Sequence, residues 1–291
     1  MRRRTKVLVV DDSVVVRRTI SAWLSADVGL EVVATASTGK LALERLAQNL
    51  PDLVLLDIEM PEMDGIEALR QIRARHPDLP VLIFSVSTER GAMRTLDALG
   101  AGASDYVTKP ASVGAHPLSS ECVRMELLAK IHALTSAQRG TGGRPKQPST
   151  KDRQAAQKAS SPRVAPVELL VLGASTGGPS ALHEVLSALP SEMRVPVLLV
   201  QHMPPMFTRI FAERLNAQIA LDVREAVVGE VLTPGRVWVA PGDFHMTVVR
   251  DGPSMRVGVS KGPPENSCRP AVDEPVPVFK DRNLAPVQTF R

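Results

Sequence analysis

The first half of the chain alternates short apolar runs with stretches whose apolar residues recur at helical spacing. Each run is about as long as a β-strand, and several are apolar throughout, as in strands buried on both faces of a parallel sheet. The runs are Lys6–Val10, Leu30–Val33, Leu53–Leu56, Val81–Phe84 and Tyr106–Thr108. This pattern predicts five parallel strands.

Three other stretches in this half each carry the apolar face of a helix. Their apolar positions are Val16, Ile20, Trp23 and Leu24, then Ile66, Leu69 and Ile72, and finally Val123, Leu127, Ile131 and Leu134. Strands alternating with helices predict a doubly wound α/β domain of the (βα)5 type over residues 1–135. In such a sheet, ligand chemistry belongs at the carboxyl ends of the strands.

The alternation resumes at about residue 166 and predicts a second doubly wound α/β domain, Rossmann-like, over residues 166–291. Its expected strands are Glu168–Leu172, Pro196–Gln201, Arg236–Ala240 and Met246–Arg250. Its expected helices are Phe207–Ala217 and Pro179–Ala188, the latter with a proline in its first turn. A glycine-rich turn, Gly173–Gly178, precedes the Pro179 helix.

The stretch 136–165 separates the two halves and changes how the net charge is interpreted. It holds seven basic residues and one acidic residue, so it carries +6, while the whole chain is +4 and the remainder is therefore −2. It has almost no apolar residues to bury, which predicts a flexible basic linker. Because the basic charge lies in the linker, the sequence does not predict a nucleic-acid-binding face.

The rest of the composition is that of a globular protein, with 44% hydrophobic residues. No apolar run approaches the ~18 residues that a membrane span needs, and the apolar stretch after the basic start is halted by Asp11 and Asp12. Cys122 and Cys268 are isolated thiols without a disulfide framework. We expect a cytoplasmic protein that does not insert into membranes.

Four charged side chains follow the ends of predicted strands in the first half. Asp11 and Asp12 follow the first strand, Asp57 the third and Lys109 the fifth, so all four are expected at one edge of the sheet. Three neighbouring carboxylates repel each other and favour a hard divalent cation such as Mg²⁺. Lys109 can pair with a carboxylate or with a phosphoryl oxygen. Each aspartate alone is better explained as a helix cap or loop carboxylate, and only the convergence predicts a site.

The segments that carry these residues resemble the receiver domains of two-component response regulators, over Lys6–Leu134. They read VVDDS to Ser13, LLDIEMP to Pro61, MDG to Gly65 and YVTKP to Pro110. The resemblance implies that Asp57 accepts a phosphoryl group from a histidine of a partner kinase. It implies Mg²⁺ ligands at Asp11, Asp12, Asp57 and the main-chain carbonyl of Glu59. It also implies three switch residues, which are Tyr106, Lys109 and a hydroxyl at Ser85, with Ser87 as the alternative.

A serine and a histidine follow two strands of the second half. Ser175 lies in Gly173–Gly177, which fits G-x-S-x-G, a tight strand-to-helix turn that raises the hydroxyl beside helix N-terminal amides. Alone, this pattern is equally compatible with a glycine-rich turn that binds phosphate or nothing. His202 ends the next apolar strand, so its imidazole is expected to face Ser175 across adjacent strand ends.

Five segments of this half resemble the chemotaxis protein-glutamate methylesterases. They read LGASTGGP to Pro179, VQHMPP to Pro205, FAERL around Arg214, APGDFHM around Asp243 and GPPEN around Glu265. The resemblance implies that Ser175 attacks γ-methyl esters of receptor glutamates, with His202 as general base and methanol as product. It also implies deamidation of receptor glutamines, and it implies no cofactor for the esterase.

The same resemblance implies partners and regulation. The partners are a histidine kinase as phosphodonor and methylated chemoreceptors, and the expected state is a monomer. The resemblance also implies that the unphosphorylated receiver covers the esterase face and that phosphorylation of Asp57 relieves this block.

The resemblance stops after Arg269–Asp273. The family's third triad member is an aspartate in a later Met-x-x-Asp-Gly loop, which does not occur in the printed sequence. Three prolines, Pro275, Pro277 and Pro286, also oppose the helix expected there. We therefore expect a frameshifted or truncated C-terminus, no third triad carboxylate, and neither Asp273 nor Asp281 as a replacement. Losing the triad carboxylate costs about 10⁴ in turnover in serine proteases.

Two function classes follow. The first is a phosphorylation-regulated receptor methylesterase and glutaminase that is impaired by the missing carboxylate. The alternative is a catalytically inactive response regulator that acts only as a phosphoreceiver and as a kinase- or receptor-binding module. A DNA-binding regulator is disfavoured, because the second half has no helix-turn-helix pattern.

Overall fold

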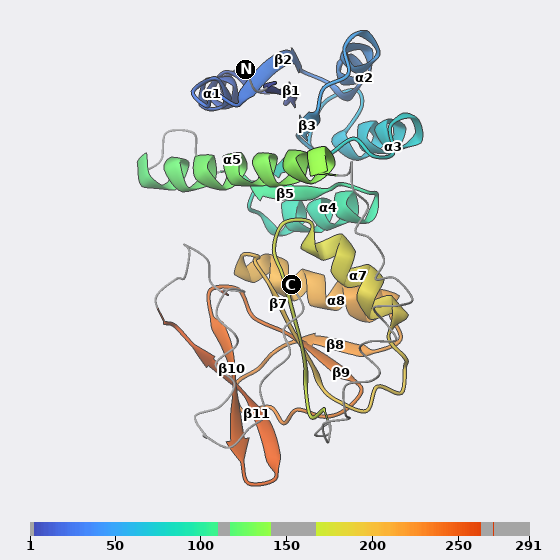
Figure 1. Cartoon of the computed structure of the whole chain (residues 1–291), viewed down its shortest axis with the longest axis vertical. Coiled ribbons are helices and arrows are strands. Elements are labelled where there is room, and N and C mark those ends of the chain that lie inside the picture. Colours follow the sequence, from blue (N-terminus) through green and yellow to red (C-terminus); the bar gives the residue numbers. More distant parts are fainter. Residues whose placement is uncertain (1–2, 110–116, 141–166, 263–269, 271–291) are drawn as a thin grey trace, which may run out of the picture.

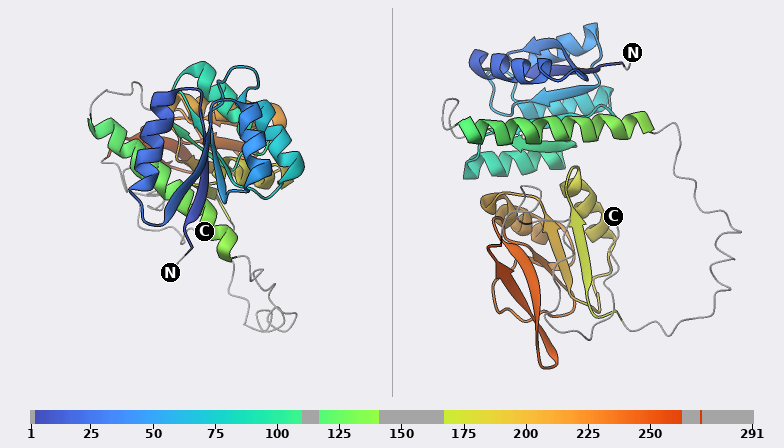
Figure 2. Two further views of the ribbon diagram at one scale, coloured as in Figure 1. Left: turned by 90° about the horizontal axis from the view of Figure 1, so that it is seen from above. Right: turned by 60° about the vertical axis from the view of Figure 1, so that its left-hand side comes forward.

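Two α/β domains are stacked on each other in the computed structural model of the chain (Figures 1 and 2). The structure describes residues 3–109, 117–140, 167–262 and 270. None of the helices in these ranges is long and apolar enough to cross a lipid bilayer.

Five parallel strands form the sheet of the first domain, as predicted. They are β1 (Thr5–Val10), β2 (Leu30–Ala36), β3 (Leu53–Leu56), β4 (Val81–Ser85) and β5 (Asp105–Thr108). Their order is β2-β1-β3-β4-β5, so β5 forms one edge of the sheet. β2 continues three residues beyond the prediction because Ala34–Ala36 pair with Leu8–Val10 of β1.

Helices cover both faces of this sheet, because successive strand side chains point to opposite faces. The helices are α1 (Val14–Ser25), α2 (Gly39–Gln48), α3 (Gly65–Arg75), α4 (Glu89–Gly100) and α5 (Pro117–Gly140). Val7 and Val9 pack with apolar residues of α1 and α5. Leu8 and Val10 lie in the cluster that contains residues of α2, α3 and α4. This is the doubly wound arrangement that the alternating pattern predicted.

The predicted linker begins where α5 ends. α5 continues to Gly140, so five residues of the predicted range 136–165 are helical. Residues 141–166 lie outside the described part of the chain, and the linker assignment there stays a prediction.

The second domain is built on a four-stranded parallel sheet of order β6-β7-β9-β8. Its elements are β6 (Leu170–Ala174), α7 (Gly178–Ala188), β7 (Val197–Gln201), α8 (Pro205–Gln218), β8 (Asp222–Glu225) and β9 (Arg236–Val239). α7 and α8 pack on one face of the sheet. The other face packs against a hairpin of β10 (His245–Asp251) and β11 (Ser254–Ser260).

Two strands of this domain were not predicted, and a third begins later than predicted. β8 is an edge strand in which only Val223 is buried, and β11 is a half-exposed hairpin strand, so neither has a clear apolar signal. β6 spans Leu170–Ala174 rather than Glu168–Leu172, since Gly173 and Ala174 pair with Val200 and Gln201 of β7. The glycine-rich turn therefore begins at Ser175.

The two domains share one continuous apolar core. α4 of the first domain packs against α7 and α8 of the second, which lie on the side facing it in Figure 1. Residues of both domains, such as Leu96 on α4 and Phe207 on α8, belong to a single cluster of buried side chains. β5 and α4 therefore face the second domain.

Candidate functional site

The predicted acidic cluster is assembled at the carboxyl ends of β1, β3 and β5. Ligand oxygens of Asp11, Asp12 and Asp57 all lie within 4.8 Å of one another, forming an acidic pocket typical of a Mg²⁺ site. Asp11 and Asp57 are buried, whereas Asp12 is exposed. Lys109 Nζ lies 2.8 Å from Asp11 Oδ2 and 2.7 Å from Asp57 Oδ2.

Burial and neighbouring charges shift the pKa values of Asp57 and Lys109 in opposite directions. Burial, the largest influence, raises the pKa of Asp57 to about 6, although Lys109 pulls it down. Burial alone would lower the pKa of Lys109, but the carboxylates of Asp57 and Asp11 raise it. Lys109 is therefore held as a cation, beside a carboxyl that ionises less readily than that of a free aspartate.

Local backbone contacts fix the position of Asp57. Its Oδ1 accepts a hydrogen bond from the Ile58 amide at 2.8 Å. The first residue of α3, Gly65, lies so close that a Cβ there would be 2.0 Å from the main-chain oxygen of Asp57. Only glycine fits this approach without moving the Asp57 loop.

The other residues expected in the switch occupy different surroundings. The side chain of Glu59 faces Arg90, with 3.9 Å between Oε1 and Nε. Ser85 is buried at the end of β4, and its hydroxyl donates to the Gly91 carbonyl at 3.4 Å. Ser87 is exposed in the loop beyond β4. The buried ring of Tyr106 points toward the second domain.

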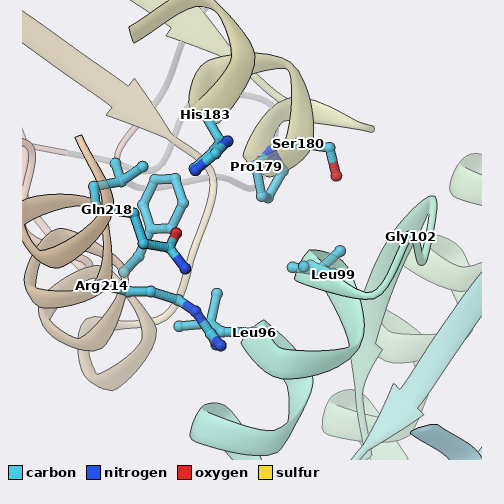
Figure 3. A pocket seen from close by; sticks show the side chains of 11 residues that line it. Leu96, Leu99, Gly102, Pro179, Ser180, His183, Arg214 and Gln218 are labelled. Carbon is cyan, nitrogen blue, oxygen red and sulfur yellow. The ribbon is translucent and has the colours of Figure 1, made fainter. Parts of the chain in front are cut away.

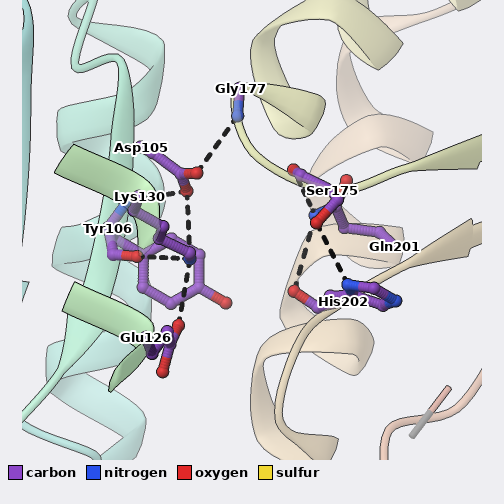
Figure 4. A network of polar contacts seen from close by, with 8 residues as sticks. All are labelled: Asp105, Tyr106, Glu126, Lys130, Ser175, Gly177, Gln201 and His202. Atoms are coloured by element: carbon purple, nitrogen blue, oxygen red, sulfur yellow. Dashed lines mark hydrogen bonds and ion pairs between the residues drawn. The ribbon is translucent and has the colours of Figure 1, made fainter. Parts of the chain in front are cut away.

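The structure brings the predicted serine and histidine of the second domain together. Ser175 directly follows β6 and His202 directly follows the neighbouring strand β7. Ser175 Oγ lies 3.1 Å from His202 Nδ1 (Figure 4). Ser175 is exposed and His202 is half-buried, so the pair is accessible from solvent. Asp273 and Asp281 lie outside the described residues.

A polar contact joins the first domain to the serine loop, which is residues 175–177 between β6 and α7. The carboxylate of Asp105, the first residue of β5, accepts a hydrogen bond from the Gly177 amide at 3.1 Å (Figure 4). Gly177 is the N-cap of α7, has φ of 73°, and supplies no side chain to cap the helix itself. Burial raises the pKa of Asp105, against the opposing effect of Lys130.

Apolar and charged contacts surround this link. The rings of Tyr106 and Phe207 stack with centroids 4.9 Å apart and planes 1° from parallel. Arg209 pairs with Glu89 at 2.7 Å, and Arg214 pairs with Asp97. Both pairs connect α8 to α4.

A cavity of about 360 Å³ lies beside these contacts, between α4 and the two helices of the second domain (Figure 3). Its wall includes Leu96, Leu99, His183, Arg214 and Gln218. It contains neither the acidic pocket nor the Ser175–His202 pair.

Sequence reasoning missed three residues at these sites: Asp105, Gln201 and Phe207. The only sequence signal for Gln201 is that it is the polar last residue of an otherwise apolar predicted strand, whereas Asp105 lies just before the predicted strand Tyr106–Thr108. Phe207 had no signal that distinguishes an interdomain contact from an ordinary core position.

Comparisons with known proteins match both domains. The family model of the response regulator receiver domain matches residues 7–115, and that of the CheB methylesterase matches residues 170–279. The protein-glutamate methylesterase/protein-glutamine glutaminase of Nocardioides sp. is 52% identical over 270 residues, which are 92% of this chain and 73% of that protein. The protein of the same description from Trichodesmium erythraeum is 45% identical over 269 residues, 92% of this chain and 76% of that protein.

Among solved structures, the crystal structure of the Thermotoga maritima CheB methylesterase catalytic domain is similar to part of this chain. The aligned part is 40% identical with a TM-score of 0.36, and it covers 38% of this chain and 58% of that one.

Proposed function

This chain belongs to the family of CheB-type protein-glutamate methylesterases/protein-glutamine glutaminases, hydrolases regulated by a receiver domain, and from that premise we propose roles for its own residues. Asp57 is the phosphoacceptor and Ser175 is the nucleophile. The observation that carries the esterase assignment is the 3.1 Å contact between Ser175 Oγ and His202 Nδ1 at adjacent strand ends.

At the receiver, an oxygen of Asp57 bonds to phosphorus as the P–N bond to a kinase histidine breaks, and the histidine nitrogen keeps the electron pair. Lys109, held as a cation 2.7 Å from Asp57, is placed to bind a phosphoryl oxygen. Asp11, Asp12, Asp57 and the main-chain carbonyl of Glu59 are the proposed Mg²⁺ ligands, and a bound Mg²⁺ supplies positive charge next to the phosphoryl group. The three clustered carboxylates support this assignment.

At the esterase site, His202 takes the hydroxyl proton while Ser175 Oγ bonds to the γ-carbonyl carbon of a glutamate methyl ester. This step needs the neutral tautomer with its proton on Nε2, because Nδ1 faces the serine. His202 then gives the proton to the departing oxygen, and methanol leaves. Water hydrolyses the acyl-serine to leave a glutamate. The same steps on a glutamine release ammonia.

Regulation is proposed to act through the contact between the domains. The Asp105 carboxylate binds the amide of Gly177 at the N-terminus of α7, and Gly177 is two residues after the nucleophile Ser175. Ser175 itself is exposed. The docked receiver therefore excludes a chemoreceptor helix, which needs room around the serine loop, more than it excludes small molecules. Phosphorylation of Asp57, whose carboxylate contacts Lys109 just beyond the other end of β5, loosens this docking. The substrates are methylated chemoreceptors, and the reaction takes place in the cytoplasm, where the kinase phosphorylates the receiver.

A second candidate function keeps the receiver chemistry without esterase turnover, because the acidic pocket and the Ser175–His202 pair lie in separate domains. If turnover is abolished, the chain acts as a phosphoreceiver and as a kinase- or receptor-binding module.

Methanol release from a methylated chemoreceptor separates the two functions. The wild-type chain and its Ser175→Ala variant are compared with and without a small-molecule phosphodonor. Release that needs Ser175 and rises with phosphodonor supports a regulated esterase. Equal background release from both proteins, with Asp57 still phosphorylated, favours the second function. If Asp57→Asn is phosphorylated like wild type, the receiver assignment is wrong.

A further inference from the structure

A buried glutamine lies beneath the proposed catalytic pair. Gln201 is the last residue of β7 and directly precedes His202. It pairs in register with Ala174 of β6, which directly precedes Ser175. Only 2% of Gln201 is exposed, so its side chain lies inside the end of the sheet rather than in the solvent.

One amide group of this side chain contacts the main chain of both reactive residues. Gln201 Nε2 donates to the Ser175 carbonyl at 3.0 Å and to the His202 carbonyl at 3.4 Å (Figure 4). Because each carbonyl fixes the plane of its peptide, these bonds restrict how the serine loop and the end of β7 can move relative to each other. The distance between Ser175 Oγ and His202 Nδ1 depends on that relative position.

The oxygen of the Gln201 amide shows why the side chain at this position is an amide. Gln201 Oε1 is buried and has no hydrogen-bond partner among the described residues. A buried unpaired acceptor costs about 1–3 kcal/mol, and an apolar side chain would fill the same space without that cost. If the amide were turned over, Oε1 would face two carbonyl oxygens and repel them. The hydrogen bonds that Nε2 donates are therefore the reason why a glutamine, and not an apolar residue, occupies this position.

Glycine makes room for this side chain. Gly178, the first residue of α7, lies against Gln201, so that a Cβ there would be 1.9 Å from Oε1. The packing of α7 onto the sheet and the position of the Gln201 amide therefore depend on each other.

We infer that Gln201 is a positioning residue that holds Ser175 and His202 at reacting distance through their main-chain carbonyls. This inference rests on the proposed function of that pair. A displacement of about 1 Å in a reacting group can cost about 100-fold in rate.

The first test replaces Gln201 with leucine. We expect kcat for methanol release and the rate of fluorophosphonate labelling at Ser175 to fall about 100-fold, with KM nearly unchanged. The matched control is Asn216→Leu, which removes the hydrogen bond that Asn216 Oδ1 accepts from the Val223 amide, away from the pair. It should lower the thermal unfolding midpoint but not the labelling rate. If both variants lose activity in proportion to stability, Gln201 is merely structural and the inference is wrong.

The second test uses Gln201→Glu and pH. An ionised carboxylate repels the two carbonyls, but a protonated one can donate to them, and burial favours protonation. We expect the ratio of variant to wild-type labelling rate to rise as pH falls from about 8 to 5, around the raised pKa of such a buried carboxyl. A ratio that is constant with pH contradicts a role for the donor.

A third measurement separates this inference from the proposed function. The pKa of His202 is measured by NMR in wild type, Ser175→Ala and Gln201→Leu. If both substitutions shift it in the same direction, Gln201 maintains the serine–histidine contact, even if no methanol is released. If Ser175→Ala shifts it and Gln201→Leu does not, the inference fails while the pair stands. If neither shifts it, there is no pair to position and both fail.

Discussion

At the scale of single residues, burial sets the chemistry of the acidic pocket. The side chains that follow the predicted strands lie in two groups, Asp57 with Lys109 and Ser175 with His202. The pKa of Asp57, however, depends on the depth of its pocket, which raises it to about 6. No local sequence pattern encodes that depth.

This raised pKa leads to a prediction about stability and pH. Burial raises the pKa of Asp57 from its ordinary value of 3.8 to about 6 in the folded chain. Ionising Asp57 therefore opposes folding, and stability falls as pH rises from about 4 to 6. Asp57→Asn removes this loss. At pH 7 and without Mg²⁺, we expect its receiver to be more stable by about 3 kcal/mol, since one pKa unit is worth about 1.4 kcal/mol. At pH 3 the two should be equal.

Urea unfolding followed by Trp23 fluorescence in a Trp238→Phe background measures this difference for the receiver. Added Mg²⁺ should stabilise wild type and not Asp57→Asn, which narrows the gap. A variant less stable than wild type at pH 7 would contradict the raised pKa.

At the scale of elements, β5 has a role that its sequence does not reveal. Its apolar pattern predicted a strand, and the structure confirms one. As the edge strand, it carries Lys109 beyond one end and Asp105 at the other, so it connects the acidic pocket to the serine loop. This connection requires a second domain against the edge, and a strand pattern contains no such information.

Replacing Asp105 with asparagine tests β5 as the connection. The variant keeps the shape of the side chain but removes the charge at the N-terminus of α7, which contributes about 1 kcal/mol. We expect unphosphorylated chain to release methanol from methylated receptor about 5-fold faster. Fluorophosphonate labelling of Ser175 should change little, because the serine is already exposed.

Asp52→Asn is the control, because the Asp52 carboxylate also accepts a main-chain amide, that of Lys6 at 2.8 Å, but within the receiver. An equal rise in methanol release from both variants would refute a specific role for Asp105.

At the scale of the whole molecule, the two domains are held together by a shared apolar core with ion pairs beside it. The stacked rings of Tyr106 and Phe207 belong to this core, and two ion pairs join α4 to α8. The ion pairs are partly exposed, so each contributes only about 0.2–1 kcal/mol and weakens with salt. The ion pairs therefore add little to the stability of the docked arrangement, and the apolar contacts between the domains supply most of it.

Reversing one charge of the Arg214–Asp97 pair tests this arrangement. In Arg214→Asp, two like charges face each other, and we expect amide hydrogen exchange in the serine loop to be about 5-fold faster, or more, as the domains separate. The double variant Arg214→Asp with Asp97→Arg should restore protection. High salt should affect wild type more than the apolar Arg214→Leu variant. If the double variant exchanges as fast as the single one, the pair does not contribute to docking.

The sequence by itself determined the two α/β domains, the strand ends that carry the reactive residues and the family to which they belong. These features are local: a strand, a tight turn and the residue after it are neighbours along the chain. The strands β8 and β11 were not predicted because they bury few side chains and therefore lack an apolar pattern. Only the tertiary structure decided the pKa of Asp57, the contact of Asp105 with Gly177 and the place of Gln201 beneath two carbonyls. Each of these depends on burial or on contact between distant segments, and both arise only when the chain is folded.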